Sequence, residues 1–146
     1  MKLLSRSPAD TETVGFRVGK MLTAGTIVKM YGDLGAGKTT LVKGIARALG
    51  IPSESVVSPS FTIITEYGSS PRLLHIDLYR ISGSSDLEST GIWDAIASDA
   101  VTAIEWPEHA GDELPEDAVV IRIEHLSDDE RTITIEGIDE EYWHNL

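Results

Sequence analysis

Cysteine is absent from the 146-residue chain, which excludes disulfide bonds, thiolate metal ligands and catalysis by a thiol. Long apolar runs are absent too, and none approaches the roughly 20 residues that a membrane-spanning helix requires. The stretch Met1–Arg6 turns polar too soon for a secretory signal. We therefore expect a cytoplasmic protein with no membrane-spanning segment.

Positive charge is scarce, because 12 lysines and arginines stand against 24 aspartates and glutamates, and the formal net charge is −12. A chain this acidic repels a phosphate backbone and gains little from counterion release. We therefore expect no tight autonomous binding to nucleic acid. The acidic surface favours solubility or docking on a basic protein partner, and the sequence leaves both readings open.

Aromatic residues make up only 6% of the chain, whereas 41% of the residues are hydrophobic, a balance typical of soluble globular proteins. The length suffices for one full hydrophobic core, and no internal repeat or linker divides it. We expect a single domain over residues 1–138. Residues 139–146 pair acidic with aromatic side chains and form a C-terminal tail, which we expect to be frayed or to dock on a partner.

A phosphate-binding pattern is the most informative feature that the chain does contain. Residues 32–39 read Gly-Asp-Leu-Gly-Ala-Gly-Lys-Thr, which fits the pattern Gly-x-x-x-x-Gly-Lys-Thr. The glycines allow the backbone to turn its N–H groups inward as a nest for phosphate oxygens. In such a loop Lys38 reaches the β- and γ-phosphates, and the Thr39 hydroxyl ligates Mg²⁺.

The segments on either side of this pattern decide whether it is credible. The run Thr26–Tyr31 is apolar and β-prone, and residues 40–49 place apolar side chains on one helical face before Gly50 ends the helix. The loop is therefore expected between a strand and a helix, with the helix N-terminus directed at the bound anion. The competing interpretation is an ordinary glycine-rich turn without a ligand.

The remaining pattern predicts an α/β protein. A helix is expected from Pro8, capped by Ser7, to about Thr23, and another over Asp86–Ser98. The predicted strands are residues 2–5, 26–31, 61–67, 72–79, 101–106, 118–124 and 131–136. Late hairpins indicate a three-layer sandwich of the kind seen in phosphate-loop NTPases, in which helices flank a mixed sheet with antiparallel edge strands.

Two carboxylates are candidates for work beside the loop. Glu105 ends the apolar run Val101–Glu105, and a carboxylate at the C-terminal end of a buried strand can bind Mg²⁺ directly or through water. Asp77 shares one face of its strand with His75 and Tyr79. It can therefore orient the attacking water, or hold the ligands of Mg²⁺ without binding the ion itself. A solvated strand end for Glu105, and an ordinary half-exposed strand for Asp77, are the alternatives.

Three further features are less specific. Residues 58–62 bring three hydroxyls beside a proline and are expected to form a switch-like or ordinary loop. Trp106 is expected to pack with partial exposure, because Pro107 ends the strand there. The four histidines show no spacing typical of a metal site.

Several blocks together resemble the bacterial TsaE family, formerly called YjeE, over roughly residues 5 to 136. The most specific are His75-Ile76-Asp77-Leu78-Tyr79-Arg80 and Ile104-Glu105-Trp106-Pro107. The others are residues 32–40, 58–61 and 87–92. The resemblance implies a small phosphate-loop ATPase needed to form threonylcarbamoyl-adenosine in tRNA beside the anticodon. It implies TsaD and TsaB as protein partners, which would handle most of the contact with tRNA.

The resemblance also implies roles for individual residues. Thr39 and Glu105 would ligate Mg²⁺, Asp77 would be a catalytic carboxylate, and residues 58–61 would form a first switch. The residues implied to bind ATP or ADP are Ala9, Thr11, Gly35, Ala36, Gly37, Lys38, Thr39, Thr40 and Trp106. With Mg²⁺, Lys38 would neutralise charge that develops on the γ-phosphate, and a slow, partner-stimulated hydrolysis is expected because no arginine finger is evident.

Two other functions remain open from the sequence. A small-molecule kinase shares this loop and size, but it would need an arginine-rich lid, for which the chain has few arginines. A nucleotide-sensing module without physiological hydrolysis would bind nucleotide equally well. No guanine-recognition block such as Asn-Lys-x-Asp is present, which favours ATP over GTP.

Overall fold

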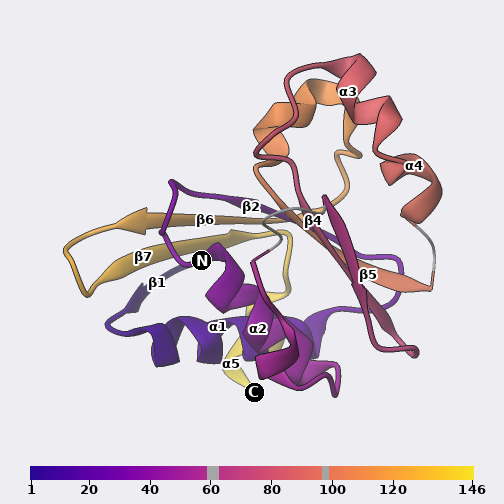
Figure 1. Ribbon diagram of the computed structural model, residues 1–146. Helices are drawn as coiled ribbons and strands as arrows, with labels where there is room; N and C mark the ends of the chain where they lie inside the picture. Colours follow the sequence, from indigo (N-terminus) through magenta and orange to yellow (C-terminus); the bar gives the residue numbers. More distant parts are fainter. Residues whose placement is uncertain (59–62, 97–98) are drawn as a thin grey trace.

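A seven-stranded mixed sheet, in the order β1-β7-β6-β2-β5-β4-β3, forms the centre of the computed structural model (Figure 1). The structure describes residues 1–58, 63–96 and 99–146. Within these ranges no helix is long and apolar enough to span a bilayer. The strands are β1 (Lys2–Ser5), β2 (Ile27–Tyr31), β3 (Ile64–Tyr67), β4 (Arg72–Asp77), β5 (Ala100–Glu105), β6 (Val119–His125) and β7 (Arg131–Glu136).

The four central strands are parallel and the edges are antiparallel. Strand β2 lies between β5 and β6, and β4 extends the parallel part beyond β5. On one side β3 pairs antiparallel with β4, and on the other β7 pairs antiparallel with β6 and β1. The predicted mixed sheet with antiparallel edges is thus confirmed. Parallel β2, β5 and β4 end at the same edge, which is where α/β sheets bind ligands.

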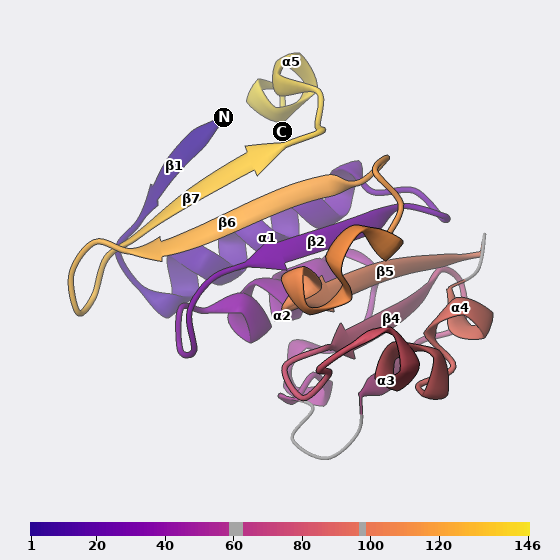
Figure 2. The same ribbon diagram turned by 90° about the horizontal axis from the view of Figure 1, so that it is seen from above.

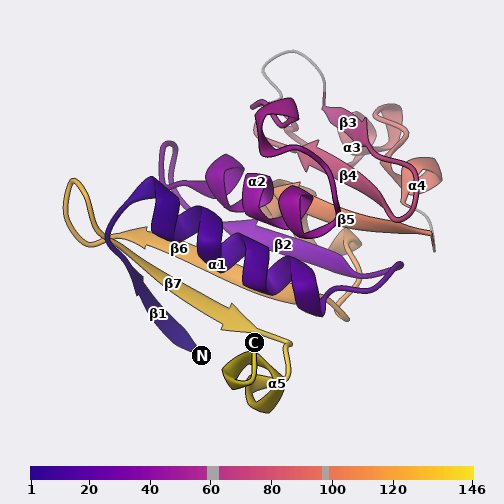
Figure 3. The ribbon, with the colours of Figure 1, turned by 90° about the horizontal axis from the view of Figure 1, so that it is seen from below.

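Helices α1 (Pro8–Met21) and α2 (Lys38–Ala48) cover one face of the sheet, as Figure 3 shows. They approach unusually closely, because a Cβ built on Gly44 would lie 2.0 Å from the carbonyl oxygen of Glu12. Side chains from both helices join the inner face of the sheet in one apolar cluster that includes Val18, Leu41 and Ile121. This packing fixes the start of α2 above the carboxyl end of β2.

The opposite face carries shorter elements, seen from above in Figure 2. These are α3 (Ser84–Ser89), α4 (Ile92–Ala95) and the 3-10 segment η2 (Pro107–Glu113). Leu87 and Ile92 pack with Ile104 in a second apolar cluster. The predicted single helix over 86–98 is wrong in its length, because Gly91 has φ 74° and separates two short helices.

The C-terminal residues are not frayed. They form α5 (Glu140–His144), in which Trp143 is buried and Asp139 caps the first turn. The Arg17 guanidinium lies over the Trp143 ring, 4.1 Å from its centroid, and donates to the Trp143 carbonyl oxygen at 2.5 Å. The tail is therefore docked on α1 of its own chain. A short 3-10 turn, η1 (Ser53–Ser55), completes the described elements.

Candidate functional site

The predicted phosphate-binding loop lies where the sequence placed it, between the end of β2 and the start of α2. Gly35 and Gly37 have φ angles of 77° and 114°, in the left-handed region that other residues rarely adopt. Gly37 is the N-cap of α2, so the first N–H groups of an 11-residue helix open onto the loop. Such a loop and helix start form an anion-binding nest.

Lys38 begins α2 and points back across the loop. Its ammonium donates to the Gly32 carbonyl oxygen at 2.5 Å and lies 3.6 Å from the centroid of the Trp106 ring. Burial lowers the pKa of Lys38, and nearby carboxylates, Glu105 foremost, oppose that effect. A buried cation with a single carbonyl acceptor favours an incoming anion.

Thr39 is the second anchor of the site, because it connects the loop to the sheet. Its hydroxyl donates to Glu105 Oε2 at 3.1 Å. A hydroxyl that donates its proton to a carboxylate keeps its oxygen lone pairs available for another ligand. Thr39 and Glu105 both line the same cavity. Hydroxyl and carboxylate oxygens are the ligand types that Mg²⁺ prefers.

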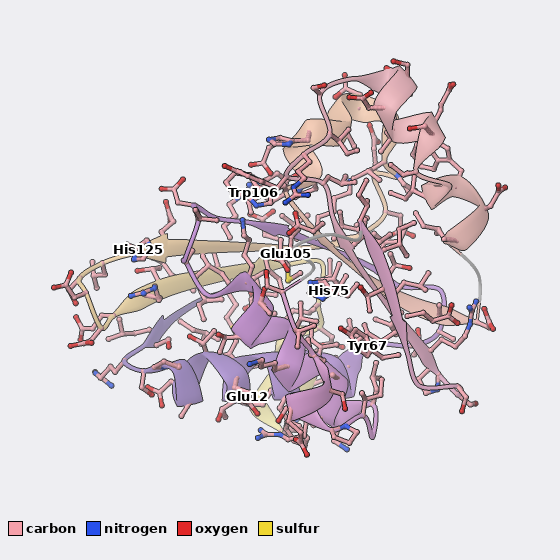
Figure 4. The ribbon with its side chains drawn as sticks, viewed as in Figure 1. Glu12, Tyr67, His75, Glu105, Trp106 and His125 are labelled. Carbon is pink, nitrogen blue, oxygen red and sulfur yellow. The ribbon has the colours of Figure 1, made fainter. Side chains whose placement is uncertain are left out.

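Glu105 ends β5 and is 4% exposed, so the solvated strand end considered above is excluded. Besides Thr39, its Oε2 contacts Nε2 of His75 from β4. Figure 4 shows His75, Glu105 and Trp106 following one another beside the start of α2. Across residues 1–58, 63–96 and 99–146 no group of three or more His, Asp or Glu side chains can hold a metal unaided. A metal here would therefore need further ligands beyond these described side chains.

Asp77 ends β4 and is the register partner of Glu105 on the neighbouring parallel strand, with strands about 4.8 Å apart. Asp77 Oδ1 accepts a hydrogen bond of 2.9 Å from the backbone N–H of Tyr79. Burial raises the pKa of Asp77, that hydrogen bond lowers it, and the Glu105 carboxylate raises it. Two carboxylates thus meet at one edge, one fixed by bonds and the other half-exposed.

Aromatic rings form the wall beyond these carboxylates. Trp106 has φ 57°, a left-handed conformation that turns the chain from β5 into η2. Its ring lies 5.1 Å from that of Tyr79 and 5.5 Å from that of His109, measured between centroids. The predicted partial exposure of Trp106 is confirmed. Of these rings, that of Trp106 covers one side of the Lys38 ammonium.

Two cavities adjoin the loop and share Gly35, Gly37 and Thr40. One has a volume of about 260 Å³. Its lining residues are Leu34, Gly35, Gly37, Lys38, Thr39, Thr40, Asp77, Tyr79, Glu105 and Trp106. The other, of about 160 Å³, lies between α1 and the β6–β7 turn. We call the two adjoining cavities together the cleft; the larger is lined by Lys38, Asp77 and Glu105, and the smaller by Thr11 and Arg131.

Most of the predicted site residues come together in this cleft, and one does not. Thr11 lines the smaller cavity and bonds to the Ser5 hydroxyl at 2.8 Å. Ala9 is exposed on the first turn of α1 and is not part of either lining. Residues 59–62 of the predicted switch lie outside the described residues.

Two site residues were not predicted. Arg131 lines the smaller cavity, and its Nε donates to the Ala36 carbonyl oxygen at 3.1 Å, which ties β7 to the loop. The sequence placed His75 on one face of its strand with Asp77 and Tyr79, and left open whether that face is a site wall or half-exposed. His75 is fully buried, because α2 covers that face. The alternation in residues 75–79 carried a signal for His75, whereas no local pattern pointed to Arg131.

Comparisons with known proteins agree with this geometry. The family model described as "Threonylcarbamoyl adenosine biosynthesis protein TsaE" matches residues 5–133. A tRNA threonylcarbamoyladenosine biosynthesis protein TsaE from Treponema pallidum is 40% identical over 135 residues, which are 92% of this chain and 99% of that protein. The Bacillus subtilis protein of the same name is 36% identical over 144 residues, covering 97% and 89%. The crystal structure of Bacillus subtilis YdiB superposes with a TM-score of 0.74 at 32% identity, over 97% of this chain and 88% of that one.

Proposed function

The chain belongs to the TsaE family of threonylcarbamoyl adenosine biosynthesis proteins, and from this membership and the cleft we propose that it is a Mg²⁺-dependent ATPase. Its role would be to support the threonylcarbamoyl modification of the tRNA adenosine next to the anticodon, in the cytoplasm. The observation that carries the proposal is the hydrogen bond between Thr39 and Glu105, which joins the loop to the end of β5. A glycine-rich turn without a ligand would not require a hydrogen bond between its last residue and a strand-end carboxylate.

The cleft would accommodate the parts of ATP. The triphosphate would lie across the loop N–H groups, with Lys38 at the β- and γ-phosphates. The adenosine would lie in the smaller cavity, which Thr11 and Arg131 line. Thr39 and Glu105 would hold Mg²⁺ together with phosphate oxygens and water, a ligand set that Mg²⁺ commonly takes. The ion, when bound, supplies charge neutralisation on the phosphates.

Hydrolysis would proceed by in-line attack of a water oxygen on the γ-phosphorus, with cleavage of the bond to the oxygen that stays with ADP. Asp77, half-exposed at the rim of the larger cavity, would accept a hydrogen bond from that water and set its direction. Lys38 would stabilise negative charge on the phosphate oxygens as it develops. No arginine is among the described residues that line the larger cavity, and slow turnover of the protein alone is therefore expected.

The partners that this proposal names are the TsaB and TsaD proteins. The net charge of −12 supports contact with protein in preference to RNA. A TsaB–TsaD complex would then raise the hydrolysis rate and carry the tRNA, while this chain supplies the energy of ATP hydrolysis.

The test is genetic and chemical. The gene is deleted in the organism that carries it, and bulk tRNA is digested and assayed for the threonylcarbamoyl nucleoside. The modification should disappear, return with the wild-type gene and fail to return with Lys38→Ala. Intact modification in the deletion strain would refute the proposed role in tRNA.

A further inference from the structure

His75 is a fully buried polar side chain in the middle of a strand. Its neighbours along β4, Leu74 and Ile76, are also buried and apolar. Burying an imidazole costs free energy unless its polar atoms find partners, and an aliphatic residue would fill the position at less cost. The contact between His75 Nε2 and Glu105 Oε2 therefore offers the explanation for a histidine at this position.

The tautomer of this ring follows from its two nitrogens. Among the described residues, His75 Nδ1 is the one buried side-chain nitrogen or oxygen without a hydrogen-bond partner. An unpaired lone pair is less costly to bury than an unpaired N–H, and a carboxylate oxygen can only accept. The proton must therefore sit on Nε2, from which His75 donates to Glu105.

Glu105 is held through one of its two oxygens. Oε2 accepts from both Thr39 Oγ1 and His75 Nε2. No hydrogen bond from a described residue reaches Oε1, and this atom is not among the buried unsatisfied ones. Because Glu105 lines the larger cavity, Oε1 is the oxygen left for the cleft. Two donors from different elements thus fix the carboxylate plane and leave one oxygen available.

We propose that His75 is a positioning residue for Mg²⁺ binding, which acts by holding the Glu105 carboxylate so that Oε1 faces the metal position. This inference rests on the proposed function, since it assumes that Glu105 serves Mg²⁺. Thr39 alone cannot do this work, because its hydroxyl, in the first turn of α2, is itself expected at the metal. His75 is anchored by the sheet, and its ring cannot rotate in a packed core.

The first test reads the tautomer in the wild-type protein. Nitrogen-15 NMR of the imidazole resonances should show a protonated Nε2 and an unprotonated Nδ1 for His75. The opposite tautomer would overturn the proposal outright, and this result does not depend on whether any variant folds.

The second test compares two substitutions of different chemistry. His75→Leu removes the donor and keeps an apolar filling, whereas His75→Gln can place an N–H near the position of Nε2. The Mg²⁺ affinity of the complex with a non-hydrolysable ATP analogue is measured by calorimetry. We expect His75→Leu to weaken Mg²⁺ binding about 10- to 100-fold, the effect typical of groups that orient a metal ligand, and His75→Gln to restore most of it.

Controls separate this effect from general damage. Ile76→Val lies on the same strand, faces the opposite side of the sheet and should leave Mg²⁺ affinity unchanged. Nucleotide affinity in the presence of EDTA should be equal in wild type and His75→Leu. If wild type binds nucleotide with no Mg²⁺ dependence, the proposed function fails. If wild type shows that dependence and His75→Leu matches it, the inference about His75 fails alone.

Discussion

The ammonium of Lys38 rests against the face of the Trp106 indole, 3.6 Å from the ring centroid, while donating to the Gly32 carbonyl oxygen. A cation over an aromatic face gains about 0.5–2 kcal/mol, the larger value when it is desolvated. Phosphate oxygens would compete for the same ammonium with full negative charge. The environment of Trp106 should therefore respond to nucleotide.

We predict that ATP binding changes the fluorescence of Trp106, because Lys38 moves from the indole to the phosphates. Emission is titrated with a non-hydrolysable ATP analogue in wild type and in Trp106→Phe. The variant should lose most of the change while Trp93 and Trp143 still emit. An equal change in Trp106→Phe would place the signal elsewhere and contradict the prediction.

Removing the Asp77 charge should separate binding from turnover. Asp77→Asn keeps an oxygen that can accept from the Tyr79 N–H, so the local turn is preserved. We expect kcat for ATP hydrolysis to fall about 10²- to 10⁴-fold, the range of general-base and water-orienting groups. Nucleotide affinity should remain near that of wild type. Unchanged hydrolysis would show that Asp77 is not catalytic, and would favour a nucleotide sensor if tRNA modification also survived.

The same substitution should change stability in a pH-dependent way. Burial raises the pKa of Asp77 above 3.8, so the folded state favours the protonated carboxyl. The stability that this preference adds is fully present below 3.8 and is lost as the pH rises through the raised pKa. At pH 7 the ionised Asp77 therefore costs free energy, and Asp77→Asn should unfold at higher urea concentration than wild type. The difference in urea midpoint between Asp77→Asn and wild type should shrink as the pH falls towards 3.8. A difference in midpoint that stays constant with pH would contradict this account.

The contact between α1 and α2 should tolerate no added atom. Gly44→Ala would put a Cβ 2.0 Å from the Glu12 carbonyl oxygen, so the helices must separate. We expect a loss of about 1–3 kcal/mol in the free energy of unfolding, typical of overpacking. In the control Gly83→Ala, the added Cβ has no atom within 4 Å, so the free energy of unfolding should change by less than about 0.5 kcal/mol. Equal stability of the two variants in urea denaturation would refute the role of this packing.

The sequence predicted much of the fold because its signals were local. Ser7 caps α1 through a hydrogen bond from the Asp10 N–H, with Pro8 in the first turn, as the pattern indicated. The mixed sheet followed from apolar runs separated by turns. The break at Gly91 was missed because the surrounding apolar spacing fits a continuous helix equally well. The docking of Trp143 on Arg17 was missed because the two residues are distant in sequence.

The site shows the same division. The loop and the strand-end carboxylates Asp77 and Glu105 could be predicted, because β4 and β5 carry them to one edge. The residue that covers the smaller cavity could not be predicted, because Arg131 on β7 lies 95 residues from Ala36 in the sequence. The burial of His75 depends on α2, a contact that strand alternation does not reveal.

Phosphate release from ATP by the purified protein tests the central claim most directly. Rates are measured with Mg²⁺, with EDTA, and with Mg²⁺ plus the TsaB–TsaD complex, with Lys38→Ala as the inactive control. The account predicts slow Mg²⁺-dependent release by the protein alone, acceleration by the complex, and loss of both in the variant. Equal release by wild type and Lys38→Ala, or no Mg²⁺-dependent release even with the complex, would contradict it.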